Sequence, residues 1–262
     1  RQTSADTLEA DTLAVLSDLN HASQKGLQTI FDCSVGRSTV NHPLGGRYQL
    51  TPTEASVQKL PVQHGVTYTA SVMAQGFNPY LAEWSPYHGA AYAVIEATAR
   101  LVAAGANWSK ARFSYQEYFE RMDKQAERFG QPVAALLGSI EAQIQLGLPS
   151  IGGKDSMSGT FEELTVPPTL VAFGVTTADS RQVLSPEFKT SGENIYYIPG
   201  QALAQEIDFD LIKSNFAKFE GIQKAHKVIS ASAVKYGGVL ESLALATFGN
   251  HIGAEVTLPE LE

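Results

Sequence analysis

Apolar side chains recur with helical spacing in two long segments of the chain. From Pro86 to Ala104 they form one stripe, and Gly105 follows it, as is common after a helix end. From Pro132 to Leu146 the stripe is stronger, and we expect its large residues to face the core: Val133, Leu136, Leu137, Ile140 and Ile144. The same reasoning predicts shorter helices over residues 12–19, 118–130 and 239–248.

Strand patterns lie between these helices. The segment from Val66 to Ala74 alternates as a half-buried strand does, and Thr169 to Val175 is a continuous apolar run typical of a fully buried strand. Further strands are predicted over residues 111–118 and 194–198, and glycines and prolines between residues 32 and 61 indicate short strands and turns.

This alternation of strands and helices predicts an α/β (α+β) chain in two parts. We expect a helical lead-in over residues 1–35, a first domain over residues 36–180 and a second, partial domain over residues 190–262. The polar stretch from Asp179 to Glu193 is the predicted linker. The chain lacks an initiator methionine and stops within a pattern, so we expect it to be a piece of a longer polypeptide.

Composition excludes several classes of protein. The formal net charge of −8 argues against a nucleic-acid-binding face, which needs clustered lysine and arginine. No apolar run approaches the length that spans a membrane, so we expect no membrane partner. The single cysteine, Cys33, excludes an internal disulfide and a cysteine metal cluster, which fits a reducing cytoplasm. The histidines show no metal-ligand spacing, none is expected beside Cys33, and we identify no catalytic nucleophile and base.

The segment from Ile151 to Thr160 carries the most informative polar pattern. Gly152 and Gly153 allow backbone N–H groups to approach an anion, and Lys154 adds a positive charge. Asp155 is a candidate Mg²⁺ ligand, and Ser156 adds a hydroxyl donor. The spacing is not that of a Walker A motif, and a tight turn with solvated side chains explains the pattern equally well.

Two pairs of charged residues elsewhere have simpler structural interpretations. Glu54 and Lys59 lie five residues apart, as on an exposed strand face. Glu96 and Arg100 lie at i and i+4 of the first long helix, where an ion pair stabilises the helix surface.

Four ordered segments resemble the large, single-chain phosphoribosylformylglycinamidine synthases. Residues 149–158 resemble their Gly-Lys-Asp-Ser-Met-Ser signature, and residues 53–59 resemble a strand of the wider family that includes aminoimidazole ribonucleotide synthetase. Residues 102–119 and 237–255 resemble two further segments of that family. The chain matches the third synthetase domain and the first part of the fourth.

The resemblance implies a fold and a reaction. The implied fold is an aminoimidazole ribonucleotide synthetase-like domain whose mixed sheet pairs with a sister domain into a barrel, followed by part of a second α/β domain. The implied activity is an ATP-dependent amidotransferase or ligase of purine biosynthesis, in which ATP activates formylglycinamide ribonucleotide and glutamine-derived ammonia forms the amidine. It implies ATP and Mg²⁺ as cofactors and a glutaminase domain of the same polypeptide as partner. Substrate or nucleotide phosphate would bind at Gly152, Gly153, Lys154, Asp155 and Ser156.

The resemblance also implies an auxiliary nucleotide site. Its residues would be Lys25, Glu54, Lys59, Glu96 and Arg100, with Glu54 and Glu96 as metal ligands. Arg100 and Tyr236 stand where the family has an Asn and an Asp, and a cation at position 100 would repel Mg²⁺ and pair with Glu96 or a phosphate. We therefore expect this site to be weakened or free of metal.

Two alternatives remain at this stage. In the first, the chain is a non-catalytic scaffolding half that packs against the catalytic domain. In the second, it is a stand-alone relative of aminoimidazole ribonucleotide synthetase. An exposed half-barrel would present a large apolar patch, so the isolated chain is also expected to pair with itself.

Overall fold

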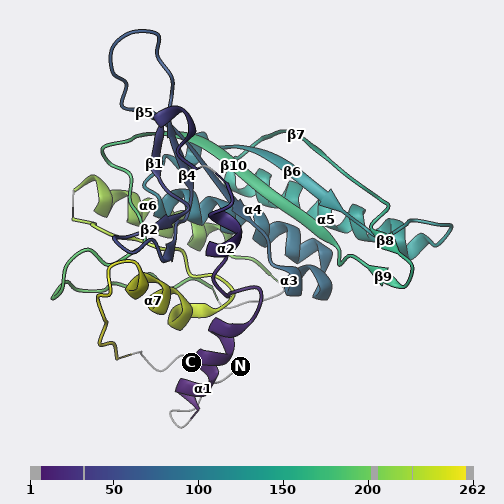
Figure 1. The fold of residues 1–262 in the computed structure, drawn as a ribbon. Coiled ribbons are helices and arrows are strands. Elements are labelled where there is room, and N and C mark those ends of the chain that lie inside the picture. Colours follow the sequence, from purple (N-terminus) through teal and green to yellow (C-terminus); the bar gives the residue numbers. More distant parts are fainter. Residues whose placement is uncertain (1–6, 32, 202–205, 226, 258–262) are drawn as a thin grey trace.

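The computed structural model describes residues 7–31, 33–201, 206–225 and 227–257. Its centre is a six-stranded sheet in the order β1-β4-β5-β10-β6-β7 (Figure 1). Neighbouring strands are antiparallel except β6 and β7, which run parallel. The strands are β1 (Thr39–Asn41), β4 (Ser56–Lys59), β5 (Thr69–Gly76), β6 (Arg112–Tyr118), β7 (Ser150–Lys154) and β10 (Thr169–Asp179).

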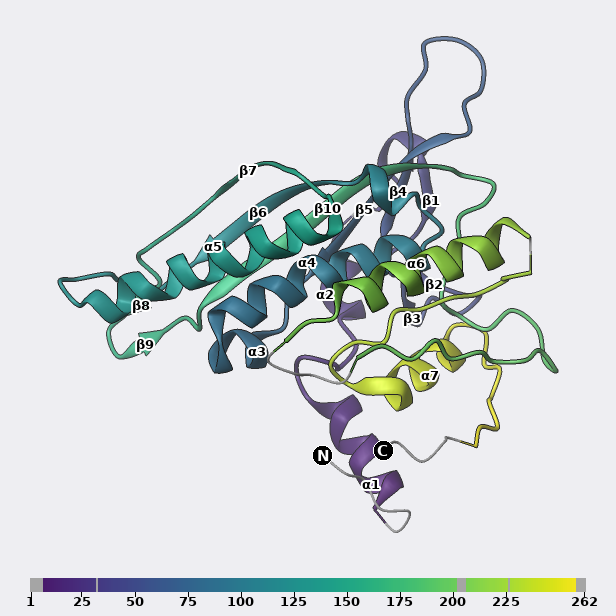
Figure 2. The ribbon, with the colours of Figure 1, turned by 180° about the vertical axis from the view of Figure 1, so that it is seen from behind.

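Two long helices, α4 (Pro86–Ala103) and α5 (Ala126–Leu146), cover one face of the sheet (Figure 2). In β5 the alternate residues Ala70, Val72 and Ala74 are buried beneath them, whereas Met73 on the other face is exposed. Gly76 lies so close to α4 that a Cβ there would be 2.1 Å from the Ala93 carbonyl oxygen. The sheet therefore has one packed face and one open face.

The predicted burial of the second helical stripe is wrong. Val133 is 55% exposed and Ile144 is 73% exposed, and Leu136, Leu137 and Ile140 are exposed with them. The helix instead buries a face of small residues: Ala135, Gly138, Ser139 and Ala142. A Cβ at Gly138 would be 1.9 Å from the Tyr87 carbonyl oxygen. Close approach of α4 and α5 thus selects small side chains and turns the large apolar ones outward.

Short elements complete the first part of the chain. They are α1 (Leu8–Ser17), α2 (Lys25–Gln28), η1 (Val35–Arg37), β2 (Leu44–Gly45), β3 (Thr51–Pro52), α3 (Pro79–Trp84), η2 (Trp108–Lys110), β8 (Thr160–Phe161) and β9 (Leu164–Thr165). The helix predicted over residues 118–130 is wrong for its first part, because residues 119–125 are irregular and α5 begins at Ala126.

The C-terminal part packs directly on the first. Helix α6 (Phe209–Lys224) contributes Phe209 to the core beneath the sheet, and Phe216 lies edge-on to Trp108 at 5.3 Å between ring centroids. Helix α7 (Gly238–Phe248) lies beside β3 and α1 (Figure 2). The strand predicted at residues 194–198 is wrong: the segment is irregular, and in the described part of the chain no strand pairs with it. The domain boundaries remain a prediction. Across the described ranges, no helix is long and apolar enough to cross a membrane.

Candidate functional site

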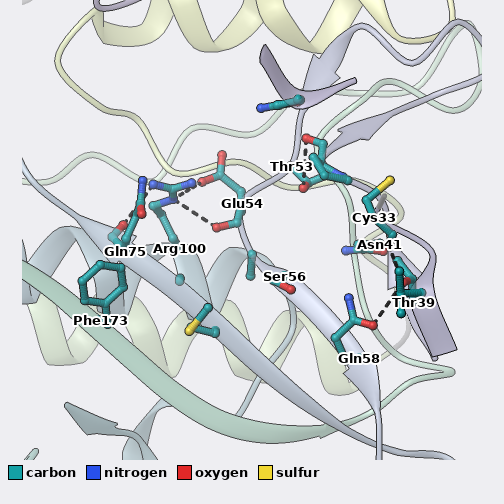
Figure 3. Close-up of a pocket in the computed structure, with 16 residues that line it drawn as sticks. Cys33, Thr39, Asn41, Thr53, Glu54, Ser56, Gln58, Gln75, Arg100 and Phe173 are labelled. Carbon is teal, nitrogen blue, oxygen red and sulfur yellow. Dashed lines mark hydrogen bonds and ion pairs between the residues drawn. The ribbon is translucent and has the colours of Figure 1, made fainter. Parts of the chain in front are cut away.

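A buried carboxylate stands where three parts of the chain meet. Glu54 follows β3, is 3% exposed, and lies between two cations. Arg100, from the last turn of α4, places Nε 3.2 Å from Glu54 Oε2. Lys235, just before α7, places Nζ 2.9 Å from Glu54 Oε1. The sheet, α4 and the C-terminal segment therefore share one charge cluster (Figure 3 shows the Glu54–Arg100 part).

The backbone fixes Arg100 in this position. Its Nε donates to the Glu54 carbonyl oxygen at 3.0 Å, and a terminal nitrogen donates to the Gln75 carbonyl oxygen at 2.9 Å. The same terminal nitrogen lies 3.9 Å from Glu96 Oε1, so the expected Arg100–Glu96 pair is present. Burial raises the pKa of Glu96 to about 7, although Arg100 and Lys235 oppose the shift.

Two cavities adjoin this cluster and share Gln28, Thr53, Glu54 and Arg100. The larger, of about 470 Å³, has a mixed lining of apolar residues, the charged pair Glu54 and Arg100, and uncharged polar residues (Figure 3): Gln28, Thr39, Asn41, Thr53, Ser56, Gln58 and Gln75. The smaller cavity, of about 190 Å³, lies between this cluster and α7.

Buried polar atoms without a hydrogen-bond partner gather in the smaller cavity. They are His21 Nε2, Gln28 Oε1, Glu54 Oε2 and Ser242 Oγ. Glu54 Oε2 is close enough to Arg100 for an ion pair but is not aligned for a hydrogen bond. The other ring nitrogen of His21, Nδ1, contacts a carboxylate oxygen of Glu241.

The residues of the implied metal site do not fit a divalent cation. Both oxygens of Glu54 face cations, and Glu96 faces Arg100 as well. Within the described residues, no group of three or more His, Cys, Asp or Glu side chains could hold a metal ion. Tyr236, at the position where the family has an acidic residue, stacks on His21 and Tyr80 instead.

The two lysines of the implied nucleotide site lie apart from this cluster. Lys25 is half-buried, and its amine donates to the Tyr48 carbonyl oxygen at 3.3 Å. The amine of Lys59 lies 5.5 Å from the centre of the Tyr68 ring. Neither residue is among those that line the two cavities. The structure thus brings together Glu54, Glu96 and Arg100 of the predicted set.

Cys33 has a histidine neighbour that the sequence patterns missed. Its Sγ lies 3.3 Å from His42 Nδ1, at the mouth of the larger cavity. The turn after η1 folds the chain back along β1, which brings position 42 to position 33. The signal is a spacing of nine residues across a turn, which no common catalytic or metal motif uses.

The Gly152–Ser156 segment is part strand rather than a loop. Gly152, Gly153 and Lys154 lie in β7, which is exposed and forms an edge of the sheet. The Ser156 amide donates to the Glu117 carbonyl oxygen at 3.0 Å. Because amides alternate in direction along an extended strand, those of Gly153 and Asp155 point to the open edge.

Glycine is required at both positions of this strand. Gly152 has a φ of 151°, which strongly favours glycine. A Cβ at Gly153 would lie 2.7 Å from the Tyr115 carbonyl oxygen. The pair lets β7 lie close to β6 while its outer amides stay accessible.

The charges of this segment lie on opposite faces of the sheet. The Lys154 amine lies 5.9 Å from the centre of the Tyr118 ring, on the open face. Asp155 stands opposite Glu117, whose buried carboxyl has a raised pKa because of desolvation and, secondarily, the negative charge of Asp155. Ser156 Oγ and Ser158 Oγ lie 3.2 Å apart. The segment does not line either cavity, and β5, β10 and β6 separate it from β4 beside Glu54.

Comparisons with known proteins agree with the motif resemblance. No protein-family model matches the chain. The chain is 23% identical to phosphoribosylformylglycinamidine synthase subunit PurL of Picrophilus torridus, over 98% of this chain and 36% of the relative. It is 24% identical to the subunit of the same name from Thermoplasma volcanium, over 94% of this chain and 34% of the relative. The chain thus spans about a third of the length of these relatives.

Solved structures show the same fold. Thermotoga maritima PurL complexed with AMPPCP superposes with a TM-score of 0.63 and 17% identity, over 94% of this chain and 38% of that one. The complex of the same protein with FGAR gives a TM-score of 0.57 at 17% identity, over 87% of this chain and 33% of that one. The predicted mixed α/β fold and the resemblance to phosphoribosylformylglycinamidine synthases are confirmed.

Proposed function

We propose that this chain is part of an ATP-dependent ligase that converts formylglycinamide ribonucleotide and glutamine-derived ammonia to formylglycinamidine ribonucleotide. The observation that carries the proposal is the match of nearly the whole chain to PurL subunits together with an exposed Gly-Gly-Lys-Asp-Ser edge strand. Because the chain spans a third of those relatives, the remaining domains supply the rest of the active site.

The proposed role of the Gly152–Ser156 segment is to hold phosphate. The outward amide of Gly153 and the hydroxyl of Ser156 can donate to phosphate oxygens, and Lys154 adds charge from the open face of the sheet. Asp155 and Ser156 are the oxygen ligands that this segment offers to a Mg²⁺ ion, which would neutralise phosphoryl charge. Fixed donors of this kind stabilise charge that develops during phosphoryl transfer.

The open face of the sheet is the proposed surface for a sister domain. Met73 and Val175 are exposed on it, and Phe173 lies half-buried beside them. Pairing two such faces would bury these side chains and close a barrel, as the motif resemblance implies. The other proposed partners are a glutaminase domain and the small-molecule substrate, in the cytoplasm.

Calorimetry on the chain and two charge-reversal variants tests the phosphate role. We expect formylglycinamide ribonucleotide to bind the wild-type chain and Lys154→Glu to weaken the affinity at least tenfold. Lys110→Glu reverses the charge of another exposed lysine and is the control, with unchanged affinity. Equal affinity of all three proteins would remove this segment from the site.

The scaffolding alternative is favoured by a separate observation. The exposed stripe of α5 is unusually apolar for a surface helix, and it lies on the side of the sheet opposite to the proposed barrel. A scaffold would use both surfaces for packing and would not bind the substrate. Substrate binding by the wild-type chain that Lys154→Glu abolishes would therefore decide against a purely scaffolding role.

A further inference from the structure

The Glu54 carboxylate is neutralised by side chains alone. It is 3% exposed, and a buried carboxylate is stable only when cations or hydrogen-bond donors replace its lost hydration. Arg100 lies beside one oxygen at 3.2 Å and Lys235 beside the other at 2.9 Å. The two cations come from positions 135 residues apart, so the cluster forms only when the C-terminal segment is folded onto α4.

The Lys235 amine contacts a Glu54 oxygen that a metal ion would need as a ligand. Its hydrogen bond to the Ala233 carbonyl oxygen is long, at 3.4 Å, so Glu54 is its principal partner. Mg²⁺ binds carboxylate oxygens at about 2.1 Å and needs further oxygen ligands around it. An ammonium and a guanidinium on the same carboxylate both obstruct that shell and repel a divalent cation.

The smaller cavity beside Glu54 also argues against a bound metal ion and phosphate. Two of its unpartnered atoms, Gln28 Oε1 and Glu54 Oε2, are acceptors, and a third, Ser242 Oγ, can donate or accept. Phosphate oxygens are also acceptors and cannot satisfy the Gln28 and Glu54 oxygens. The cavity therefore suits water or a small uncharged hydrogen-bond donor rather than a metal-bound phosphate.

We propose that Lys235 takes the place of a divalent cation on Glu54 and converts this site into a metal-independent lock between the C-terminal segment and the sheet. The lock joins the segment just before α7 to the last turn of α4 through one buried carboxylate. It needs no ligand from outside the chain. It stands independently of the phosphate role proposed for the Gly152–Ser156 segment, which lies elsewhere on the sheet.

Thermal unfolding with and without 5 mM MnCl₂ tests the lock. Lys235→Met removes the amine and keeps the apolar stem, which leaves Glu54 with Arg100 alone. We expect its Tm to fall by about 5–10 °C equally with and without Mn²⁺, because Arg100 still lies beside Glu54 and repels the cation. Lys218→Met, at an exposed position on α6, is the matched control and should keep the wild-type Tm.

Metal binding by the wild-type chain provides a second readout, which does not depend on whether the Lys235→Met variant folds. We expect Mn²⁺ titration, followed by the electron paramagnetic resonance signal of the free ion, to give the same curve for wild type and Glu54→Gln. Mn²⁺ binding by the wild type that Glu54→Gln removes would overturn the proposal. So would a Lys235→Met variant as stable as Lys218→Met.

Discussion

Glu96 should make the chain less stable as the pH rises through the neutral range. Its carboxyl has a pKa of about 7 in the folded protein, against an ordinary value of 4.5, chiefly because burial disfavours the charged form. The folded state therefore favours the protonated acid. The stabilisation is fully present below pH 4.5 and is lost as the pH rises to about 7.

The magnitude follows from the two pKa values. The interval from 4.5 to about 7 corresponds to about 3 kcal/mol, of which about 2.5 kcal/mol is lost between pH 5 and pH 8. Glu96→Gln carries no titrating proton and keeps an amide oxygen that can accept from the Phe77 backbone N–H. It should be insensitive to this loss and more stable than wild type at pH 8.

Urea unfolding at pH 5, 6, 7 and 8 measures the effect. We expect the difference in unfolding free energy between Glu96→Gln and wild type to grow by about 2.5 kcal/mol over this range. The comparison between the two proteins cancels other titrating groups, such as Glu117. Glu83→Gln, at an exposed position in α3, should follow the wild type at every pH. Parallel profiles for Glu96→Gln and wild type would refute the assignment.

Two further predictions concern α5. Gly138→Ala should destabilise the chain by about 3 kcal/mol, because the new Cβ would be 1.9 Å from the Tyr87 carbonyl oxygen. Gly130→Ala, on the same helix, is the control: its Cβ would meet nothing within 4 Å, so it should stabilise the chain by about 0.5–1 kcal/mol. Denaturant midpoints check both, and a Gly138→Ala variant as stable as wild type would contradict the packing of α4 on α5. The double substitution Leu137→Gln and Ile140→Gln should reduce self-association of the chain in sedimentation velocity. Leu27→Gln, at an exposed position in α2, is the control and should not. Equal association of the wild type, the double variant and the control would show that the apolar stripe of α5 is not a contact surface.

The secondary structure was largely predictable because periodicity and glycine punctuation are local signals. The predicted α4 agrees with the structure closely, and β10 begins at the predicted residue. The predicted full burial of that strand is wrong, because β10 has one open face on which Val175 is exposed. The direction in which α5 faces was not predictable, since large apolar residues and small residues both form a stripe on it. The choice depends on how closely α4 approaches, and that distance is set by Gly138 and Ala142 together with the partner helix.

Contacts in the candidate site that depend on tertiary packing were likewise not predictable from the sequence. Arg100 was recognised as incompatible with a metal ion from its position in the motif alone. Lys235 was not, because its amine reaches Glu54 across 181 residues of sequence through the docking of the C-terminal segment. The division of Lys154 and Asp155 between two faces likewise follows from the strand geometry of β7, whereas the glycines had indicated a loop.

The most direct test of the proposed function is a titration followed by amide NMR of the glycine-labelled chain. With increasing formylglycinamide ribonucleotide, the Gly153 amide resonance should move in a saturable way, because its N–H points to the open sheet edge and would donate to the phosphate. Gly147, in the left-handed turn after α5, is the internal control and should stay in place. A Gly153 resonance that stays in place at saturating substrate would contradict the account.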